Sequence, residues 1–271
     1  MTLKIRKNQG FTLIELLIVI GLLGALTALI LPSLSADREE ALGDVCDYNQ
    51  SGTVRILKQF HQLTGVYPND MHSGLQSLDS SAMAMDGIPE AQADHMGSGT
   101  ETCPSLYQLT ASDVNSLTEA GITSVCYGTG LNTQTLSEGD SVVRAYNNSH
   151  YWYDDSGENR VMTFNGVSLE NWETGDLNND GEPEDSSGVV LVFWIAPTTD
   201  WNANVAANKD WAHGNVKLGI DLEGQCPIPA EDTDGGEPSF AYYMAYFMVY
   251  TDGSAAKLIG TTCPECGVLN P

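Results

Sequence analysis

Apolar side chains form one long run near the start of the chain. Residues 11–32 read FTLIELLIVIGLLGALTALILP, with one charged side chain among 22 positions. An α-helix of this length extends about 33 Å, which is enough to cross the hydrocarbon core of a bilayer. The pattern therefore predicts a membrane-embedded helix at residues 11–32.

A second helical pattern follows, at residues 33–66. Apolar and small side chains recur there three or four positions apart, at Leu42, Val45, Asn49, Gly52, Ile56, Phe60 and Leu63. This spacing predicts an amphipathic stem helix with one face against a core. Asn49 and Gly52 weaken the stripe, so we expect a kink at residues 50–53. Gly65, which a proline follows closely, is expected to end the helix.

The C-terminal half carries strand patterns. Residues 189–195, 240–250 and 255–259 are short runs rich in apolar residues, and an Asp252-Gly253 pair separates the last two. Asp-Gly between two such runs is typical of a two-residue hairpin turn. We therefore expect an antiparallel hairpin in this part of the chain.

The segment between the stem and these strands has weaker patterns. Residues 79–101 are rich in Ser, Ala, Met and Gly, which is typical of a surface loop. Thr110 and Asp113 have the spacing of a capping box variant, which predicts the start of a short helix. Val114 and Leu117, one turn apart, are expected to face the core.

Together the patterns predict an α+β fold, in which a long N-terminal helix, membrane-embedded in its first half, packs on a small antiparallel β-sheet. A chain of 271 residues with 42% hydrophobic residues can bury such a core. We expect five consecutive regions: a leader at 1–10, the membrane helix at 11–32, the stem at 33–66, a loop-rich insertion with a short helix at 67–125 and a β-rich domain at 126–271.

The chain is strongly acidic, with 36 Asp and Glu against 11 Lys and Arg and a formal net charge of −25. Such a charge repels nucleic-acid phosphates, so a direct DNA or RNA partner is not expected. Lys4, Arg6 and Lys7 lie in residues 1–10, where the positive-inside bias keeps a leader in the cytoplasm. Removal of the leader makes the remaining charge more negative by three units. Such a chain repels itself unless cations screen or bind it, so a divalent metal site is worth seeking.

A secretory signal peptide is the alternative explanation of the N-terminus. Ser33 and Ser35 before Ala36 fit the small-x-small cleavage pattern. However, the apolar run is longer than the usual h-region of about 7 to 15 residues. It also contains Glu15, whose charge costs roughly 2.5–3.5 kcal/mol at the centre of a membrane helix. A carboxylate at such a place indicates a specific partner.

Residues 10–20, GFTLIELLIVI, resemble the cleavage and methylation motif of type IV pilins and type II secretion pseudopilins. The resemblance implies that a prepilin peptidase cuts between Gly10 and Phe11 and methylates the new amine of Phe11. It also implies that Glu15 faces the N-terminal amine of a neighbouring subunit. Pairing makes two buried charges tolerable that are each unfavourable alone, and it specifies the axial register.

Gly24 and Pro32 also match this family. Glycine weakens a helix through its backbone entropy, and proline removes a hydrogen bond to the preceding turn. A segment that unwinds between them would let a filament stretch. Close packing of membrane helices is the alternative explanation for Gly24.

The resemblance implies a structural subunit and not an enzyme. Subunits would wait in the inner membrane, spanning it once with a cytoplasmic leader. An assembly platform would then join them, with other copies and other pilin-like subunits, into a periplasmic or extracellular filament. Residues 66–78, VYPNDMHSGLQSL, resemble the corresponding segment of major pseudopilins and favour a secretion pseudopilus. The large globular part after the N-terminal helix favours a surface pilus, or fimbrium.

An acidic turn around Gly181 has the composition of a calcium site. Its oxygen-bearing side chains are Asp176, Asn178, Asp180, Glu182, Glu184 and Asp185. Alternating oxygen ligands around a sharp glycine turn suit the hard cation Ca²⁺. The twelfth position is Ser187 and not the Glu of an EF-hand. The turn resembles those of thrombospondin-like repeats, and the family resemblance also implies calcium in a loop of the sheet. A solvated polar turn is the alternative.

Six cysteines suit disulfides in an exported domain. A bridge between Cys103 and Cys126 would close a loop of about 24 residues and contribute on the order of 3 kcal/mol. Cys263 and Cys266 have the spacing of a redox pair or half a zinc site. No second such pair is present, so we expect structural disulfides, with Cys226 tied to one of these two.

The sequence contains no recognisable catalytic motif. Its five histidines form no HExxH, and no GxSxG is present. The rival hypothesis is a membrane-tethered or secreted calcium-binding enzyme or lectin with a pilin-like N-terminus. A catalytic constellation on the folded sheet would favour that rival.

Overall fold

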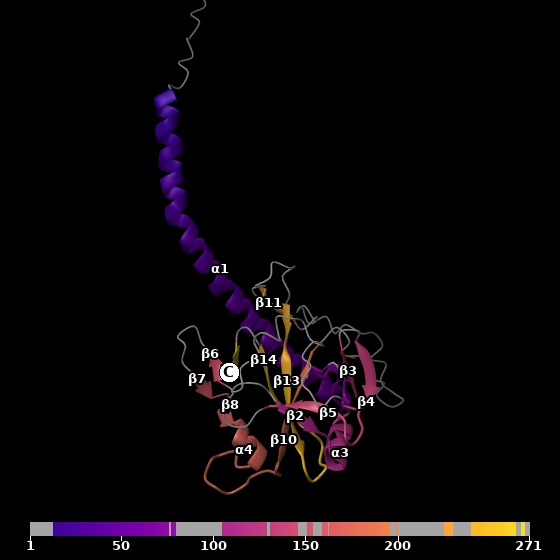
Figure 1. Ribbon diagram of the computed structural model, residues 1–271. Coiled ribbons are helices and arrows are strands. Elements are labelled where there is room, and N and C mark those ends of the chain that lie inside the picture. The colour runs from indigo at the N-terminus through magenta and orange to yellow at the C-terminus, as the bar shows by residue number, and fades with distance from the viewer. Residues whose placement is uncertain are drawn as a thin grey trace, which may run out of the picture. The chain divides into compact units, whose positions relative to one another are not determined.

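The computed structural model describes residues 13–75, 77–79, 105–128, 131–145, 151–153, 159–161, 163–195, 199, 225–229, 240–263 and 267–268 (Figure 1). The chain divides into two compact units, Met1–Asp44 and Val45–Pro271. Helices and a multi-stranded sheet occur together, so the fold is α+β, as the sequence predicts.

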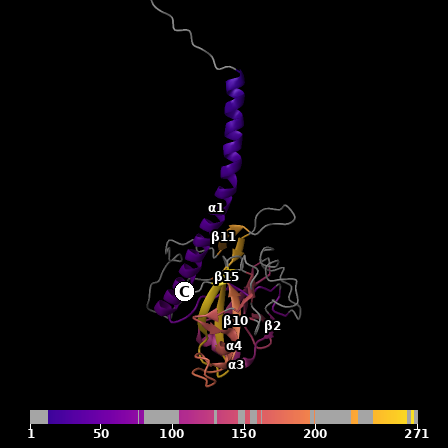
Figure 2. The same cartoon turned by 90° about the vertical axis from the view of Figure 1, so that its left-hand side faces the viewer.

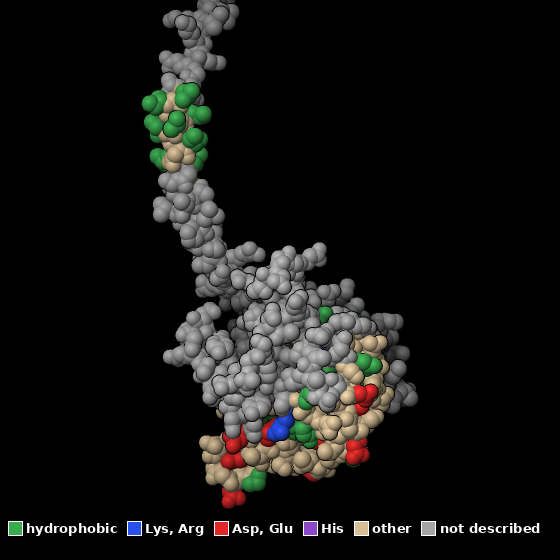
Figure 3. Space-filling model, viewed as in Figure 1, with side chains coloured by type: hydrophobic (Ala, Val, Ile, Leu, Met, Phe, Trp, Pro, Cys, Tyr) green, Lys and Arg blue, Asp and Glu red, His purple; other side chains and the backbone are tan. Residues whose placement is uncertain are grey.

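Helix α1, Leu13–Thr64, begins in the first unit and ends in the second. In the first unit its described large side chains are all apolar and exposed (Figure 3): Leu13, Ile14, Leu16, Leu17, Ile18, Val19, Ile20, Leu22 and Leu23. Their positions cover every side of the helix. A helix that is hydrophobic all round is suited to lipid or to contact with other helices.

Within the described residues, no helix is identified as both long enough and apolar enough to cross a membrane. The membrane helix predicted at residues 11–32 is therefore not confirmed. The helical backbone continues through Gly24 and Pro32, although the sequence indicated that both residues disfavour a continuous helix.

The C-terminal part of α1 packs within the second unit. Ile56 and Phe60 of the predicted stripe are buried, together with Leu57, whereas Val45 and Leu63 of that stripe are exposed. The inward stripe is therefore confirmed only in part. Gln50, which follows the stripe position Asn49, is also buried, and its Nε2 donates to the carbonyl of Thr261 in the sheet at 2.7 Å.

The helix is unbroken at residues 50–53, where the sequence predicts a kink. α1 continues through this segment, and the hydroxyl of Thr53 donates to the carbonyl of Asn49 at 2.9 Å. The helix ends before Gly65, which takes a left-handed conformation with φ of 81° and donates to the carbonyl of His61. Glycine is favoured there because it has no Cβ.

Nine of the described strands form the main sheet: β1 (Met71–His72), β2 (Ser105–Gln108), β3 (Ser124–Tyr127), β4 (Asn132–Thr135), β5 (Ser141–Arg144), β10 (Gly188–Trp194), β13 (Met244–Tyr250), β14 (Lys257–Cys263) and β15 (Gly267–Val268). Their order is β15-β14-β13-β10-β1-β3-β4, and β5 joins β2 to β10. The sheet was expected to be antiparallel, but β1 and β3 pair in parallel.

Three short hairpins complete the described strands. They are β6 (Tyr151–Tyr153) with β7 (Asn159–Val161), β8 (Thr163–Phe164) with β9 (Val167–Ser168), and β11 (Gln225–Pro229) with β12 (Phe240–Tyr242). Two further helices, α3 (Ala111–Glu119) and α4 (Leu169–Thr174), lie at the same end of the sheet (Figures 1 and 2).

The centre of the sheet is buried on both faces: every residue of β10 and β13 except Gly188 is buried, and the two strands are almost entirely aliphatic or aromatic. Side chains that alternate along these strands enter two separate cores. One core includes Phe193, together with Leu57 of α1 and Leu117 of α3. The other includes Trp194, together with Trp172 of α4.

Two local predictions are confirmed in α3. Thr110 is its N-cap and forms the capping box with Asp113. Leu117 is fully buried, and Val114 packs against the same core.

The predicted hairpin of β13 and β14 is present, but its connection is longer than two residues. Asp252 accepts hydrogen bonds from the backbone and hydroxyl of Ser254. Ala256 then donates to the carbonyl of Ser116 in α3. β14 begins directly after this tertiary contact, at Lys257.

Candidate functional site

The N-terminal residues to which the sequence gives a function lie largely outside the described structure. Gly10 and Phe11 are outside it. Glu15, Gly24 and Pro32 are placed only as backbone positions of α1. Their roles in cleavage, methylation and register therefore remain predictions.

The acidic loop begins where α4 ends. Ser168 caps the start of α4, and Gly175 ends it with φ of 81°. The carbonyl of Gly175 accepts from the backbone N–H groups of Glu184 at 2.9 Å and Asp185 at 3.2 Å. A Cβ at residue 175 would lie 2.2 Å from the Asp185 carbonyl oxygen, so this closure requires glycine.

An ion pair holds α4 against the sheet. Arg144 of β5 donates to both carboxylate oxygens of Glu173, at 3.0 and 2.6 Å. The same carboxylate accepts from the backbone N–H of Val190 at 3.1 Å. A bidentate pair with a third hydrogen bond has a fixed geometry, so the loop starts from a defined position.

Three carboxylates converge in the loop. Atoms of Asp176, Asp180 and Glu184 that could bind a metal all lie within 4.8 Å of one another. Asp176 accepts from the N–H groups of Asp180 and Gly181 at 3.0 and 2.9 Å. Glu184 accepts from the N–H of Leu177 at 2.7 Å. These backbone bonds orient the carboxylates.

The spacing of the three carboxylates leaves room for a cation between them. Calcium–oxygen distances of about 2.3–2.6 Å place ligands on opposite sides of the ion about 5 Å apart. Asp180 and Glu184 are exposed and Asp176 is half-buried, so water can complete a coordination shell. Among the described residues, none of the three forms an ion pair with lysine or arginine. Only backbone N–H groups or a bound cation can therefore offset the mutual repulsion of the three carboxylates.

Among the other predicted ligands, the carboxylates of Asp185 and Glu182 are not part of the converging group. The amide oxygen of Asn178 shares the N–H of Asp180 with Asp176 and so lies beside that carboxylate. The carboxylate of Asp185 accepts from the hydroxyl of Tyr250 at 2.8 Å and from the N–H of Ser186. Asn178 accepts from the N–H of Asp180 at 3.0 Å. Glu182 is exposed.

The far end of the loop is fixed to the hairpin of β13 and β14. The hydroxyl of Ser186 donates to Asp252 at 2.7 Å. Hydrogen bonds from Ser254 and Ser186 lower the pKa of Asp252 to about 2. Burial, followed by the bond to Asp185, raises the pKa of Tyr250. A second acidic turn of the sequence, with Asp232 and Asp234 before Gly235, is a weaker candidate for calcium and lies outside the described residues.

The cysteine pairings also remain predictions. Cys126 lies on β3 and is fully buried. Cys226 and Cys263 are placed only as backbone positions of β11 and β14, and Cys103 and Cys266 lie outside the described residues.

The described histidines have structural contacts. His61 stacks on Tyr67 with ring centroids 4.2 Å apart. His72 is buried, its Nδ1 accepts from the N–H of Gly74 at 2.9 Å, and its Nε2 lies 3.3 Å from the carbonyl of Gly128. Burial lowers the pKa of both imidazoles. Neutral imidazoles fit these packed sites.

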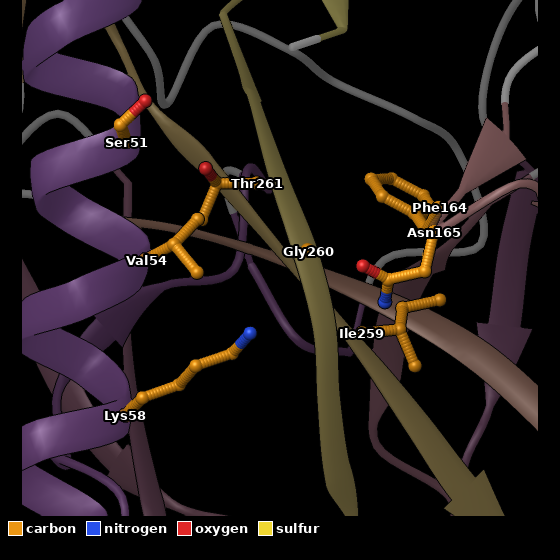
Figure 4. A pocket seen from close by; sticks show the side chains of 8 residues that line it. All are labelled: Ser51, Val54, Lys58, Phe164, Asn165, Ile259, Gly260 and Thr261. Carbon is orange, nitrogen blue, oxygen red and sulfur yellow. The ribbon is translucent and has the colours of Figure 1, made fainter. Parts of the chain in front are cut away.

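The structure also brings together residues that the sequence did not connect. A pocket of about 200 Å³ lies between α1, β14 and the β8–β9 hairpin (Figure 4). Its lining comes from three segments separated by about 100 residues each, so no spacing along the chain indicated it.

Comparison with protein families gives one match. Residues 5–31 match the family described as the prokaryotic N-terminal methylation motif, the hallmark of type IV pilins and pseudopilins. Searches of curated proteins and of solved structures gave no match. The motif implies a leader that prepilin peptidase removes, membrane anchoring, and assembly into a pilus-like filament.

Proposed function

We propose that this protein is a structural subunit of a type IV pilus or a type II secretion pseudopilus. The match of residues 5–31 to the methylation motif carries the proposal. Cleavage between Gly10 and Phe11 would free the amine of Phe11, and its N-methylation would follow.

The exposed apolar surface of α1 supports assembly through this helix. Burying one Leu, Ile or Val side chain stabilises a protein by about 1.5–3 kcal/mol. Nine such side chains are exposed between Leu13 and Leu23. In the proposed function, lipid covers them before assembly and the helices of other subunits cover them in the filament.

Glu15 gives this assembly its register. It lies in the apolar segment, where an unpaired carboxylate is unfavourable. The amine of Phe11 in an adjacent subunit is the matching charge. The pair would form at one axial offset between neighbours, and other offsets would leave both charges unpaired.

Mass spectrometry of the mature N-terminus tests the proposal. The expected first residue is N-methyl-Phe11. A mature chain starting at Ala36 would instead indicate a signal peptide and a secreted protein, and would contradict the filament function.

Within this function, we place the secretion pseudopilus first. The resemblance of residues 66–78 to major pseudopilins and the acidic loop favour it, whereas the larger body favours a surface pilus. Deletion of the gene distinguishes the two: loss of exported proteins from the medium supports a pseudopilus, and loss of surface filaments with normal secretion supports a pilus.

We further propose that the acidic loop binds Ca²⁺ and that the protein's role is structural and not catalytic. The convergence of Asp176, Asp180 and Glu184 supports the cation site. The structural contacts of His61 and His72 support a non-catalytic role. A calcium-binding enzyme or lectin with this N-terminus is the less favoured alternative.

A further inference from the structure

The pocket between α1, β14 and the β8–β9 hairpin has an apolar wall and a polar wall. Val54, Phe164 and Ile259 form its apolar wall. The ring of Phe164 packs directly over Gly260, because a Cβ at residue 260 would lie 2.2 Å from Phe164 Cδ1. A glycine in the middle of a β-strand is unfavourable by itself, and here it makes room for the aromatic wall.

The remaining lining is polar and comes from both sides of β14. Lys58 extends from α1, and Asn165 extends from the hairpin, each toward β14 (Figure 4). Ser51 adds a hydroxyl from α1. Three elements that are distant in sequence therefore supply hydrogen-bond donors to one small volume.

Thr261 supplies an independent sign of a missing partner. Its side chain is 3% exposed, and its Oγ1 has no hydrogen-bond partner among the described residues. In Figure 4 this oxygen points toward the α1 side of the pocket. An unpaired buried hydroxyl is unfavourable, and an acceptor atom of a bound ligand would satisfy it.

Lys58 indicates the charge of that ligand. The chain has 36 acidic side chains, yet Lys58 forms no ion pair with any described residue. Its ammonium is therefore available to an anion in the pocket. A single cation suits a singly charged group better than a doubly charged phosphate.

We propose that this pocket binds a carboxylate carried on a short apolar group. Lys58 pairs with the carboxylate, the hydroxyls of Thr261 and Ser51 and the amide of Asn165 donate hydrogen bonds, and the carbon chain lies along the apolar wall. A liquid water occupies about 30 Å³, so 200 Å³ holds a ligand of roughly seven heavy atoms.

Two sources offer this chemistry. One is a free short-chain acid, and the other is an Asp or Glu side chain of a second copy of this chain.

The full-length protein, purified in detergent, is titrated with sodium butyrate by isothermal calorimetry. We expect saturable binding at one site per chain, and no binding of butanol, which has a similar chain without the charge.

Substitutions locate the site. Lys58→Gln should weaken butyrate binding roughly 10- to 100-fold, because a hydrogen bond to a charged group contributes that much. Lys257→Gln is the matched control: it removes the same charge, but Lys257 lies over the ring of Trp172 and does not line the pocket. The control should bind butyrate as the wild type does.

Thr261→Val separates binding from folding. Valine keeps the shape and removes the unpaired hydroxyl, so the melting temperature should stay the same or rise while butyrate affinity falls. Unchanged affinity in both Lys58→Gln and Thr261→Val, or no saturable butyrate binding by the wild type, overturns the proposal.

Zero-length carbodiimide cross-linking of filaments mixed from ¹⁴N and ¹⁵N subunits distinguishes the sources. A link between Lys58 and a carboxylate of the differently labelled copy identifies a neighbouring subunit as the occupant. Butyrate binding without such a link identifies a free acid. The titration uses the isolated protein, so its result does not depend on filament assembly.

Discussion

The hydroxyl of Tyr250 donates a hydrogen bond of 2.8 Å to Oδ2 of Asp185, across 65 positions of the sequence. It ties the end of the acidic loop to the last residue of β13. Asp185 is thereby used for attachment, and the carboxylates that converge are those of Asp176, Asp180 and Glu184. The acidic side chains of this loop therefore have two roles: Asp185 attaches the loop to β13, and the three converging carboxylates form the candidate cation site.

Calcium is expected to raise the melting temperature of the full-length protein in detergent, relative to chelator. A ligand that binds only the folded state stabilises it by about 2.7 kcal/mol at a hundredfold excess over Kd. Asp176→Asn with Asp180→Asn should remove most of this shift, because both carboxylates belong to the converging group. Differential scanning calorimetry measures it.

Glu182→Gln is the control for this measurement, since it removes a charge from the same loop outside the converging group. It should keep the calcium shift. Mg²⁺ should stabilise poorly, because it requires a tight octahedral shell and loses its waters reluctantly. A full shift in the double variant would place the site elsewhere, with Asp232 and Asp234 next to be tested.

Gly175→Ala should lower the free energy of unfolding by about 1–3 kcal/mol, because it combines a left-handed backbone with a clash against the Asp185 carbonyl. Gly181→Ala is matched to it: φ is 90° there, but no atom lies within 4 Å of the added Cβ. Urea unfolding of both variants separates the clash from the backbone strain. Equal losses would show that the closure at residue 175 is not tight.

Tyr107 predicts a loss of stability at alkaline pH. Burial and then its hydrogen bond to Asp113 raise the pKa of its hydroxyl to about 12, whereas the unfolded value is about 10. Between these values the unfolded chain releases the proton and the folded chain keeps it, so stability falls as pH rises. Below about pH 10 this contribution is fully present.

Tyr107→Phe removes that contribution. Its unfolding free energy should be lower than that of the wild type at pH 8, because the bond to Asp113 is lost, and the difference should shrink by pH 11. Urea titrations at the two pH values measure it. A difference that stays constant with pH would contradict the assignment.

Glu15→Ala should be processed normally and assemble poorly, because it removes the partner of the neighbour's N-terminal charge. Filament yield is measured by shearing and immunoblotting, and processing by the mass of the membrane-bound subunit. Glu39→Ala, a loss of charge farther along α1, should assemble better than Glu15→Ala. Wild-type yield from Glu15→Ala would refute the register argument.

Gly10→Ala should leave full-length precursor in the membrane, because it alters the residue before the predicted cut. The mass of the membrane-bound chain reports this directly. Efficient removal of residues 1–10 from the variant would show that the cleavage site is misplaced.

The sequence alone determined the features that depend on near neighbours. The motif at residues 5–31, the cap of α3 at Thr110 and the apolar runs of β10 and β13 are all local patterns. Each is fixed by the chemistry of a few consecutive residues, so each can be recognised without knowledge of the fold. The composition of the acidic loop was visible for the same reason.

Only the tertiary structure decided which distant groups meet. Three contacts are examples, and they join residues 54 to 211 positions apart. They are the parallel pairing of β1 with β3, the hydrogen bond from Gln50 to Thr261 and the hydrogen bond from Tyr250 to Asp185. Such contacts form only after the entropy of closing long loops has been overcome, and that depends on the whole core and not on any one segment. The pocket around Lys58 and Thr261 was invisible in the sequence for this physical reason.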